Sequence, residues 1–226
     1  MEKQEILKAI KELKEKTPKR NFSQTFDLNV VIQNLDLRKE ESKIDIFLTL
    51  PNSKGKKPKI CALVGQELEA QAKKFFDLAI NKDDFIKYEK DKKLAKRLAN
   101  HYDFFIAQAN IMQLIAKGFG KVFGPRGKMP NPKAGCVVPP IADLSDLSKK
   151  LTSTVRLAIK GKETAIKTSV GNDTMNEDDV AENILAIYET LKRILPLGKD
   201  NIKKVLLKFT MGPAYEIGRG FKDVKA

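Results

Sequence analysis

Residues 60–79 read ICALVGQELEAQAKKFFDLA, and this stretch sets the fold class. Ile60–Val64 is a short apolar run of the kind that forms a buried strand, and Gly65 follows it directly. The next stretch is amphipathic and carries its apolar residues at helical spacing: Leu68, Ala72, Phe75, Phe76 and Ala79. A buried strand followed by an amphipathic helix is the repeating unit of an α/β domain.

The same alternation continues downstream. Short apolar runs at 85–88 and 102–107 are separated by a basic helical stretch that ends at Asn100, and residues 111–117 have a helical pattern. Strands that alternate with helices indicate a parallel sheet covered on both faces. We therefore expect a three-layer, Rossmann-like α/β domain over residues 61–154.

The two ends of the chain have a different pattern. Helices are expected around residues 6–13 and 178–195, and strands in five runs: 26–32, 44–50, 155–160, 164–170 and 202–209. A charged turn joins the first two runs, and Gly161-Lys162-Glu163 joins the next two as a hairpin. This pattern is typical of an antiparallel α+β domain.

A Pro, Gly and Lys stretch at 51–58 marks a linker where the pattern changes. The simplest organisation is an insertion, with two chain crossings acting as a hinge. The predicted class is thus mixed α/β and α+β, in two domains. Residues 1–60 and 155–226 form a discontinuous domain, and residues 61–154 form the inserted one.

The charge balance indicates a polyanionic partner. The 226 residues include 43 Lys and Arg against 29 Asp and Glu, a net charge of +14, and 42% hydrophobic residues are enough for a packed core. No apolar run approaches the ~20 residues of a membrane span, so nucleic acid is favoured over membrane. Cys61 and Cys136 lie in apolar sequence, which suits buried free thiols in the cytoplasm.

Catalytic and cofactor-binding motifs are scarce. His101 is the only histidine, and no group of Cys and His has metal-ligand spacing. No complete G-x-G-x-x-G or G-x-x-x-x-G-K-[ST] pattern occurs in a suitable context. We therefore predict a protein without enzyme activity, cofactor or metal. The alternative is an enzyme that uses the inserted domain.

Residues 118–135 contain five glycines, three prolines and four basic residues without an acid. This composition predicts a shaped loop with a positive face, either a solvated surface loop or one that binds phosphate. We expect a second RNA contact or a hinge loop formed by these residues: Gly124, Pro125, Arg126, Gly127, Lys128 and Lys133.

Two segments of the terminal domain suit RNA. Phe22 lies among small polar residues just before a strand, where its ring either stacks on a base or plugs the core. Thr210-Met211-Gly212-Pro213 ends a strand, and Gly212 there permits either close backbone approach to RNA or a plain turn.

The amino-acid sequence of these segments resembles that of the ribosomal protein L-one family, and above all that of its archaeal members. Residues 123–135 carry the strongest match, with 210–213, Phe22 and Thr25 supporting it. The resemblance implies that the terminal domain binds RNA, through these residues: Phe22, Thr25, Lys167, Thr210, Met211 and Gly212.

The resemblance also implies a function. Members of the family bind large-subunit rRNA, form the mobile stalk beside the exit site, assist tRNA release and repress translation of their own mRNA. The implied partners are therefore rRNA, tRNA and the protein's own mRNA. The resemblance also implies that the protein is cytoplasmic and ribosome-bound, and that it is a monomer when off the ribosome. An RNA-binding protein outside the ribosome is the alternative.

Overall fold

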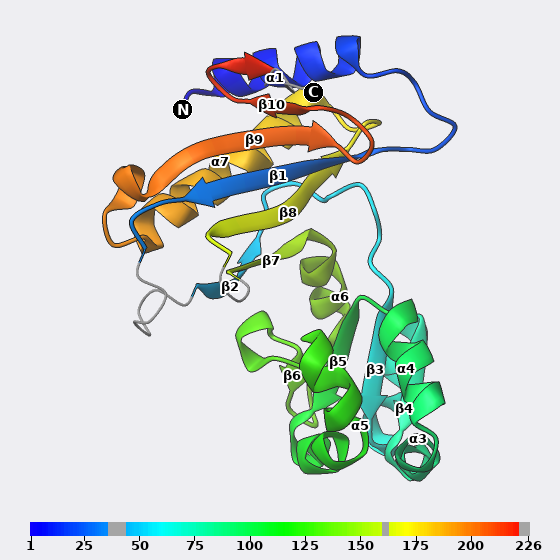
Figure 1. Ribbon diagram of the computed structural model, residues 1–226. Helices are drawn as coiled ribbons and strands as arrows, with labels where there is room; N and C mark the ends of the chain where they lie inside the picture. Colours follow the sequence, from blue (N-terminus) through cyan, green and yellow to red (C-terminus); the bar gives the residue numbers. More distant parts are fainter. Residues whose placement is uncertain (36–43, 160–162, 222–226) are drawn as a thin grey trace. The chain divides into compact units, whose positions relative to one another are not determined.

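The computed structural model describes residues 1–35, 44–159 and 163–221, which form two compact units (Figure 1). Unit 1 contains residues 1–56 and the chain from Ser153 onward, and unit 2 contains residues 57–152. The predicted mixed class, with antiparallel and parallel sheets, is confirmed. The chain passes between the units at Lys56–Lys57 and at Thr152–Ser153, and Ile60 begins the first parallel strand.

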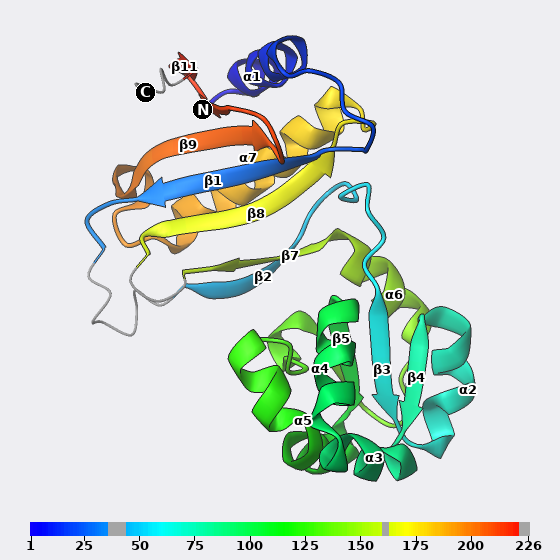
Figure 2. The same cartoon turned by 45° about the vertical axis from the view of Figure 1, so that its right-hand side comes forward.

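A five-stranded antiparallel sheet forms the body of unit 1, in the order β11-β10-β9-β1-β8. Its strands are β1 (Thr25–Ile32), β8 (Ala165–Asn172), β9 (Ile202–Phe209), β10 (Ala214–Glu216) and β11 (Gly220–Phe221). Strand β1, which pairs with β9 on one side and β8 on the other, alternates buried and partly exposed residues, so one face of the sheet is apolar. Figure 2 shows α7 running along one face of this sheet.

The helices α1 (Lys3–Lys16) and α7 (Glu177–Ile194) cover the apolar face. Each has an apolar stripe at helical spacing, with Ile6, Ile10 and Leu13 fully buried on α1. Glu2 and Glu5 form a capping box that starts α1, and the Asn176 side chain caps α7. The short helix η5 (Gly198–Asn201) leads from α7 into β9.

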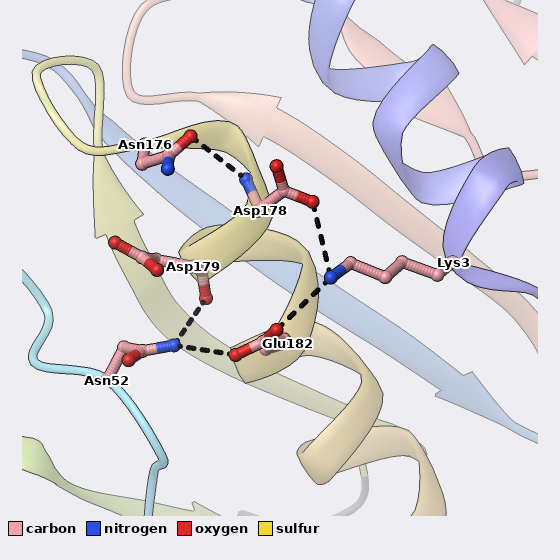
Figure 3. Close-up of polar contacts among 6 residues, drawn as sticks. All are labelled: Lys3, Asn52, Asn176, Asp178, Asp179 and Glu182. Carbon is pink, nitrogen blue, oxygen red and sulfur yellow. Dashed lines mark hydrogen bonds and ion pairs between the residues drawn. The ribbon is translucent and has the colours of Figure 1, made fainter.

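The ends of α1 and α7 are tied to the chain that leaves for unit 2 (Figure 3). Lys3 Nζ lies 3.2 Å from Asp178 and 3.1 Å from Glu182. The Asn52 side chain donates to Glu182 at 3.1 Å and to the Asp179 carbonyl at 3.4 Å. Hydrogen bonds from Lys3 and Asn52 lower the pKa of Glu182. This network fixes the first residues of the linker on unit 1.

A second, two-stranded sheet pairs β2 (Asp45–Thr49) with β7 (Thr154–Ala158). The predicted hairpin of 155–160 with 164–170 is therefore wrong, because β8 pairs with β1 instead. Arg156 donates two hydrogen bonds to Asp45, at 2.7 and 2.8 Å, which supports the observed pairing. The charged turn predicted before residue 44, and Gly161 and Lys162, lie outside the described residues.

Unit 2 is built on a parallel sheet in the order β4-β3-β5-β6. Its strands are β3 (Ile60–Val64), β4 (Leu78–Asn81), β5 (Phe104–Gln108) and β6 (Val137–Val138). One face packs on α3 (Phe85–Lys90), α4 (Lys92–His101) and α5 (Met112–Arg126). The other packs on α2 (Gln66–Phe75) and α6 (Leu144–Ser153). Short helices complete the unit: η2 (Lys82–Asp84), η3 (Ala109–Ile111) and η4 (Pro132–Ala134).

One strand of this sheet lies where the sequence pattern predicted helix. The amphipathic pattern was expected to run to Ala79, but α2 ends at Phe75 and β4 begins at Leu78. The apolar run at 85–88 is helix α3, because Phe85 packs edge-on against Phe119 of α5, with ring centroids 5.4 Å apart. Packing against a neighbouring helix has overridden the strand-like composition of this run.

The glycine-rich stretch is only partly a loop. Helix α5 continues to Arg126, because Ile115, Phe119, Val122 and Phe123 form a buried stripe at helical spacing. Pro125 lies in the last turn, and Gly127, with φ +63°, ends the helix. The predicted loop is therefore wrong for residues 118–126, and the loop proper begins at Gly127.

Both cysteines are buried free thiols, as expected. Burial raises the pKa of Cys61 to about 12 and that of Cys136 to about 11. In the described part of the chain, no helix is long and apolar enough to cross a membrane.

Candidate nucleic-acid interface

Three segments of unit 1 meet at one end of its five-stranded sheet: the start of β1, the end of β8 and the turn after β9. Thr25 and Thr210 join two of them. Their hydroxyls share a hydrogen bond at 3.0 Å, and the Thr25 amide donates to the Thr210 hydroxyl at 3.2 Å. The Thr210 amide donates to the Thr25 carbonyl at 3.1 Å. These contacts fix the strand end that carries Met211.

Gln24 and Asp173 lock the same end from within. Gln24 is 4% exposed, and its side-chain oxygen accepts from the Met211 amide at 3.3 Å. Asp173 accepts from the Ser23 hydroxyl at 2.5 Å and from the Gln24 amide at 3.1 Å. The backbone around the site is therefore held by side chains from all three segments. Sequence reasoning missed Gln24 and Asp173, since only tertiary contacts reveal their role.

Phe22 and Met211 are large apolar side chains that this rigid frame presents to solvent. Phe22 is 51% exposed and Met211 is 62% exposed. The alternative that Phe22 plugs the core is therefore wrong. An exposed ring and an exposed flexible thioether are each side chains against which a base or a sugar can lie.

Gly212 forms a tight turn, with its amide donating to the Phe209 carbonyl at 3.0 Å. A Cβ at this position would lie 3.1 Å from the Phe209 Cβ and 3.2 Å from the Thr17 hydroxyl oxygen. Contacts within the protein thus support the alternative that Gly212 serves the turn. Close approach of RNA to Gly212 stays a prediction.

Lys167 lies apart from the other predicted residues. It pairs with Asn29 in the β1–β8 ladder, four residues along β1 from Thr25 and so about 13 Å from the strand end. Its side chain forms an ion pair with Glu163 at 2.9 Å. The structure does not bring Lys167 into the cluster.

Cations and a cavity adjoin the site. Lys19 and Arg20 are exposed in the segment between α1 and β1, and neither forms an ion pair within the described residues. Together with Thr17, Asp173 and Phe209 they line a cavity of about 340 Å³. Beside the site, burial raises the pKa of Asp27 and the Lys208 cation opposes the shift. Lys19 and Arg20 could have been identified from the sequence, because they directly follow Pro18, which prevents the helix from continuing.

The basic residues predicted for a second contact lie in unit 2, and two of them are engaged within it. Arg126 Nη1 donates to the Lys96 carbonyl at 3.1 Å and to Asn100 Oδ1 at 2.6 Å. Lys128 Nζ donates to the carbonyls of Tyr102 at 2.8 Å and Asp103 at 3.1 Å, and burial lowers its pKa. These side chains close the end of α4.

The remaining members of that predicted set have mixed positions. Gly124 and Pro125 belong to α5, and Gly127 ends it. The Lys133 side chain is exposed. A second RNA contact or a hinge at this segment stays a prediction, with Lys133 as its available cation.

An exposed aromatic and thioether pair beside cations, in a chain of net charge +14, is the arrangement of a nucleic-acid-binding protein. Residues 11–213 match the model of the Ribosomal protein L1p/L10e family. The chain belongs to this family.

Relatives match over nearly the whole chain. The large ribosomal subunit protein uL1 of Methanobrevibacter smithii is 43% identical over 215 residues, covering 95% of this chain and 99% of its own. The protein of the same name from Methanothermococcus thermolithotrophicus is 40% identical over 217 residues, covering 96% and 99%. That of Thermococcus kodakarensis is 34% identical over 219 residues, covering 96% and 99%. The resemblance to archaeal members is confirmed.

Proposed function

We propose that this protein is a component of the large ribosomal subunit that binds rRNA through one end of the sheet of unit 1. Four residues there form what we call the strand-end cluster: Phe22, Thr25, Thr210 and Met211. The observation that carries the proposal is the exposed Phe22 and Met211 pair on the frame held by Thr25 and Thr210. Membership of the ribosomal family supports it. A ribosome-bound role would place the protein in the cytoplasm.

Recognition proceeds without a covalent step. The Phe22 ring stacks on a base, and Met211 packs against a sugar or base face. The Thr210 hydroxyl, exposed at the strand end, reaches a 2′-OH or a phosphate oxygen. Lys19 and Arg20 neutralise phosphates at the edge of the cluster, and this makes affinity depend on salt. Because the frame is fixed before binding, little conformational entropy is lost on association.

Two finer roles belong to the same proposal. Unit 2 serves as the outer part of a mobile stalk beside the exit site and assists the release of tRNA. The strand-end cluster also binds a segment of the protein's own mRNA that imitates the rRNA site, and so represses translation. One RNA-binding surface serves both rRNA and mRNA, because it reads RNA shape and backbone.

The test is the removal of the two exposed side chains. Phe22→Ala should weaken binding to a large-subunit rRNA fragment by about fivefold or more, since stacking on an aromatic ring contributes roughly 1–3 kcal/mol per base. Met211→Ala should weaken binding as well, because the apolar contact of its thioether side chain is lost. Both residues are exposed, so thermal unfolding should not change. Leu114→Ala is the matched control, because Leu114 is also 51% exposed but lies on α5. Affinity is measured by fluorescence anisotropy at fixed salt.

Cosedimentation with large subunits separates a ribosomal role from RNA binding elsewhere. The wild-type protein should sediment with subunits at moderate salt, and the Phe22→Ala variant should be lost first as salt rises. If Leu114→Ala weakens rRNA binding as much as Phe22→Ala, the strand-end cluster is not the interface.

A further inference from the structure

Helix α4 of unit 2 carries a concentrated positive charge that the strand-end cluster does not use. Lys92, Lys93, Lys96 and Arg97 are all exposed, and none of them forms an ion pair within the described residues. By contrast, Lys73 of α2 and Lys87 of α3 are paired with acids one turn away. The cations of α4 therefore remain available to an external anion.

A cavity of about 530 Å³ lies beside this charge, where α4 meets α3. One part of its lining is apolar or aromatic: Tyr88, Leu94 and Tyr102. The other part is polar: Arg97, Asn100 and His101. Leu94 is exposed, and burial raises the pKa of both tyrosines. Flat rings, an amide and a guanidinium thus face one hollow.

Contacts from outside α4 hold the walls of this cavity in place. The rings of His101 and Tyr102 pack edge to face with centroids 5.1 Å apart, and Lys59 Nζ lies 3.2 Å from His101 Nε2. Lys128 fixes the Tyr102 carbonyl and Arg126 fixes the Asn100 side chain. The two cations that the sequence offered as RNA ligands serve here to shape the neighbouring site.

We propose that the α4 cavity is a second RNA site, which takes one unpaired base while the exposed cations of α4 hold the adjoining phosphates. A base is flat, so it can lie against the aromatic side chains that line this open cavity, and its edge can pair with the amide of Asn100 or with His101. Arg97 lines the cavity, and Lys93 lies one turn before it, so both reach the backbone of the same strand. An acidic peptide would satisfy the charges but would leave the aromatic walls unused.

The experiment uses the full chain with Phe22→Ala and Met211→Ala, which weakens the proposed interface of unit 1. Two further changes, Lys93→Ala and Arg97→Ala, are then compared with Lys74→Ala and Lys121→Ala. The second pair removes the same charge from exposed positions on α2 and α5. The probe is a single-stranded oligouridine of about 12 nucleotides. The α4 pair should weaken binding about fivefold more than the control pair, which corresponds to roughly 1 kcal/mol.

Crosslinking locates the base. An oligouridine that carries 4-thiouridine should crosslink, on irradiation, to Tyr88, His101 or Tyr102, as identified by peptide mass spectrometry. Equal losses in the two variant pairs, or crosslinks only outside these residues, would overturn the proposal. Tighter binding of an oligoglutamate peptide than of oligouridine would replace RNA by an acidic protein partner. The crosslink does not depend on unit 1, so the two proposals can fail separately.

Discussion

Thr210 illustrates how a single residue orders the end of the sheet at which we propose that RNA binds. Its hydroxyl and amide both bond to Thr25, from a strand 185 positions away in sequence. These bonds fix the strand end next to Met211, whose own amide is held by the Gln24 side chain. Gly212 acts one residue further on, where the turn packs closely on Thr17. Residues next to each other in this turn therefore serve stability and binding separately.

Gly212→Val should destabilise the fold as well as RNA binding. An added Cβ would crowd Phe209 and Thr17, and overpacking of this kind costs about 1–3 kcal/mol of the free energy of unfolding. Urea unfolding followed by circular dichroism measures this loss. Met211→Ala is the control and should leave the unfolding midpoint unchanged, because its side chain is exposed. If Gly212→Val left the free energy of unfolding unchanged, Gly212 would not be needed for packing of the turn, and its role would be limited to the close approach of RNA.

At the scale of elements, the end of α4 depends on side chains from the segment after α5. Lys128 lies partly buried and donates to two carbonyls at the α4–β5 connection. The bond to the Tyr102 carbonyl is partly buried, so it satisfies an acceptor that would otherwise be costly to leave without a donor. The basic stretch after α5 thus acts first as a clamp between elements of unit 2.

Lys128→Met should lower the free energy of unfolding of the protein by about 1–3 kcal/mol, because its two carbonyl partners lose their donor. Methionine keeps most of the side-chain length, so the change isolates the ammonium group. Lys133→Met removes the same charge from an exposed position and should change stability little. Equal effects of the two substitutions on thermal unfolding would show that Lys128 is not a clamp.

For the whole molecule, the paired strands β2 and β7 bring the two crossings of the chain together. Thr49 pairs with Thr154, and the Leu50 amide donates to the Ser153 carbonyl at 3.0 Å. Each unit also has its own apolar core. An insertion whose ends are adjacent can be removed without stretching the host.

Residues 57–152 should therefore fold alone, and residues 1–56 joined to 153–226 by a short Gly/Ser linker should fold as well. Each fragment should unfold cooperatively in a thermal melt followed by circular dichroism. The joined fragment should keep most of the rRNA affinity, because it retains Phe22, Thr25 and Thr210. A joined fragment that folds but binds more weakly than the 57–152 fragment would show that the main interface lies in unit 2.

The sequence by itself determined the class of the two units and the family. Alternating apolar residues in β1 and the buried run Ile60–Val64 follow backbone periodicity, which acts over a few residues and is visible in the chain. Phe22, Thr25 and Thr210 were predicted as RNA-binding residues because the segments around them resemble a known family, without any knowledge of their contacts.

Only the tertiary structure decided the features that depend on distant partners. Residues 118–126 are helical because Phe119 and Phe123 pack into a core, which outweighs the local cost of the glycines. The strand at 154–158 pairs with β2 and not with β8, the next strand along the chain. Arg126 and Lys128 donate hydrogen bonds to carbonyls of their own unit. Pairing, burial and the direction of a charged side chain are set by groups far away along the chain, so local pattern leaves them open.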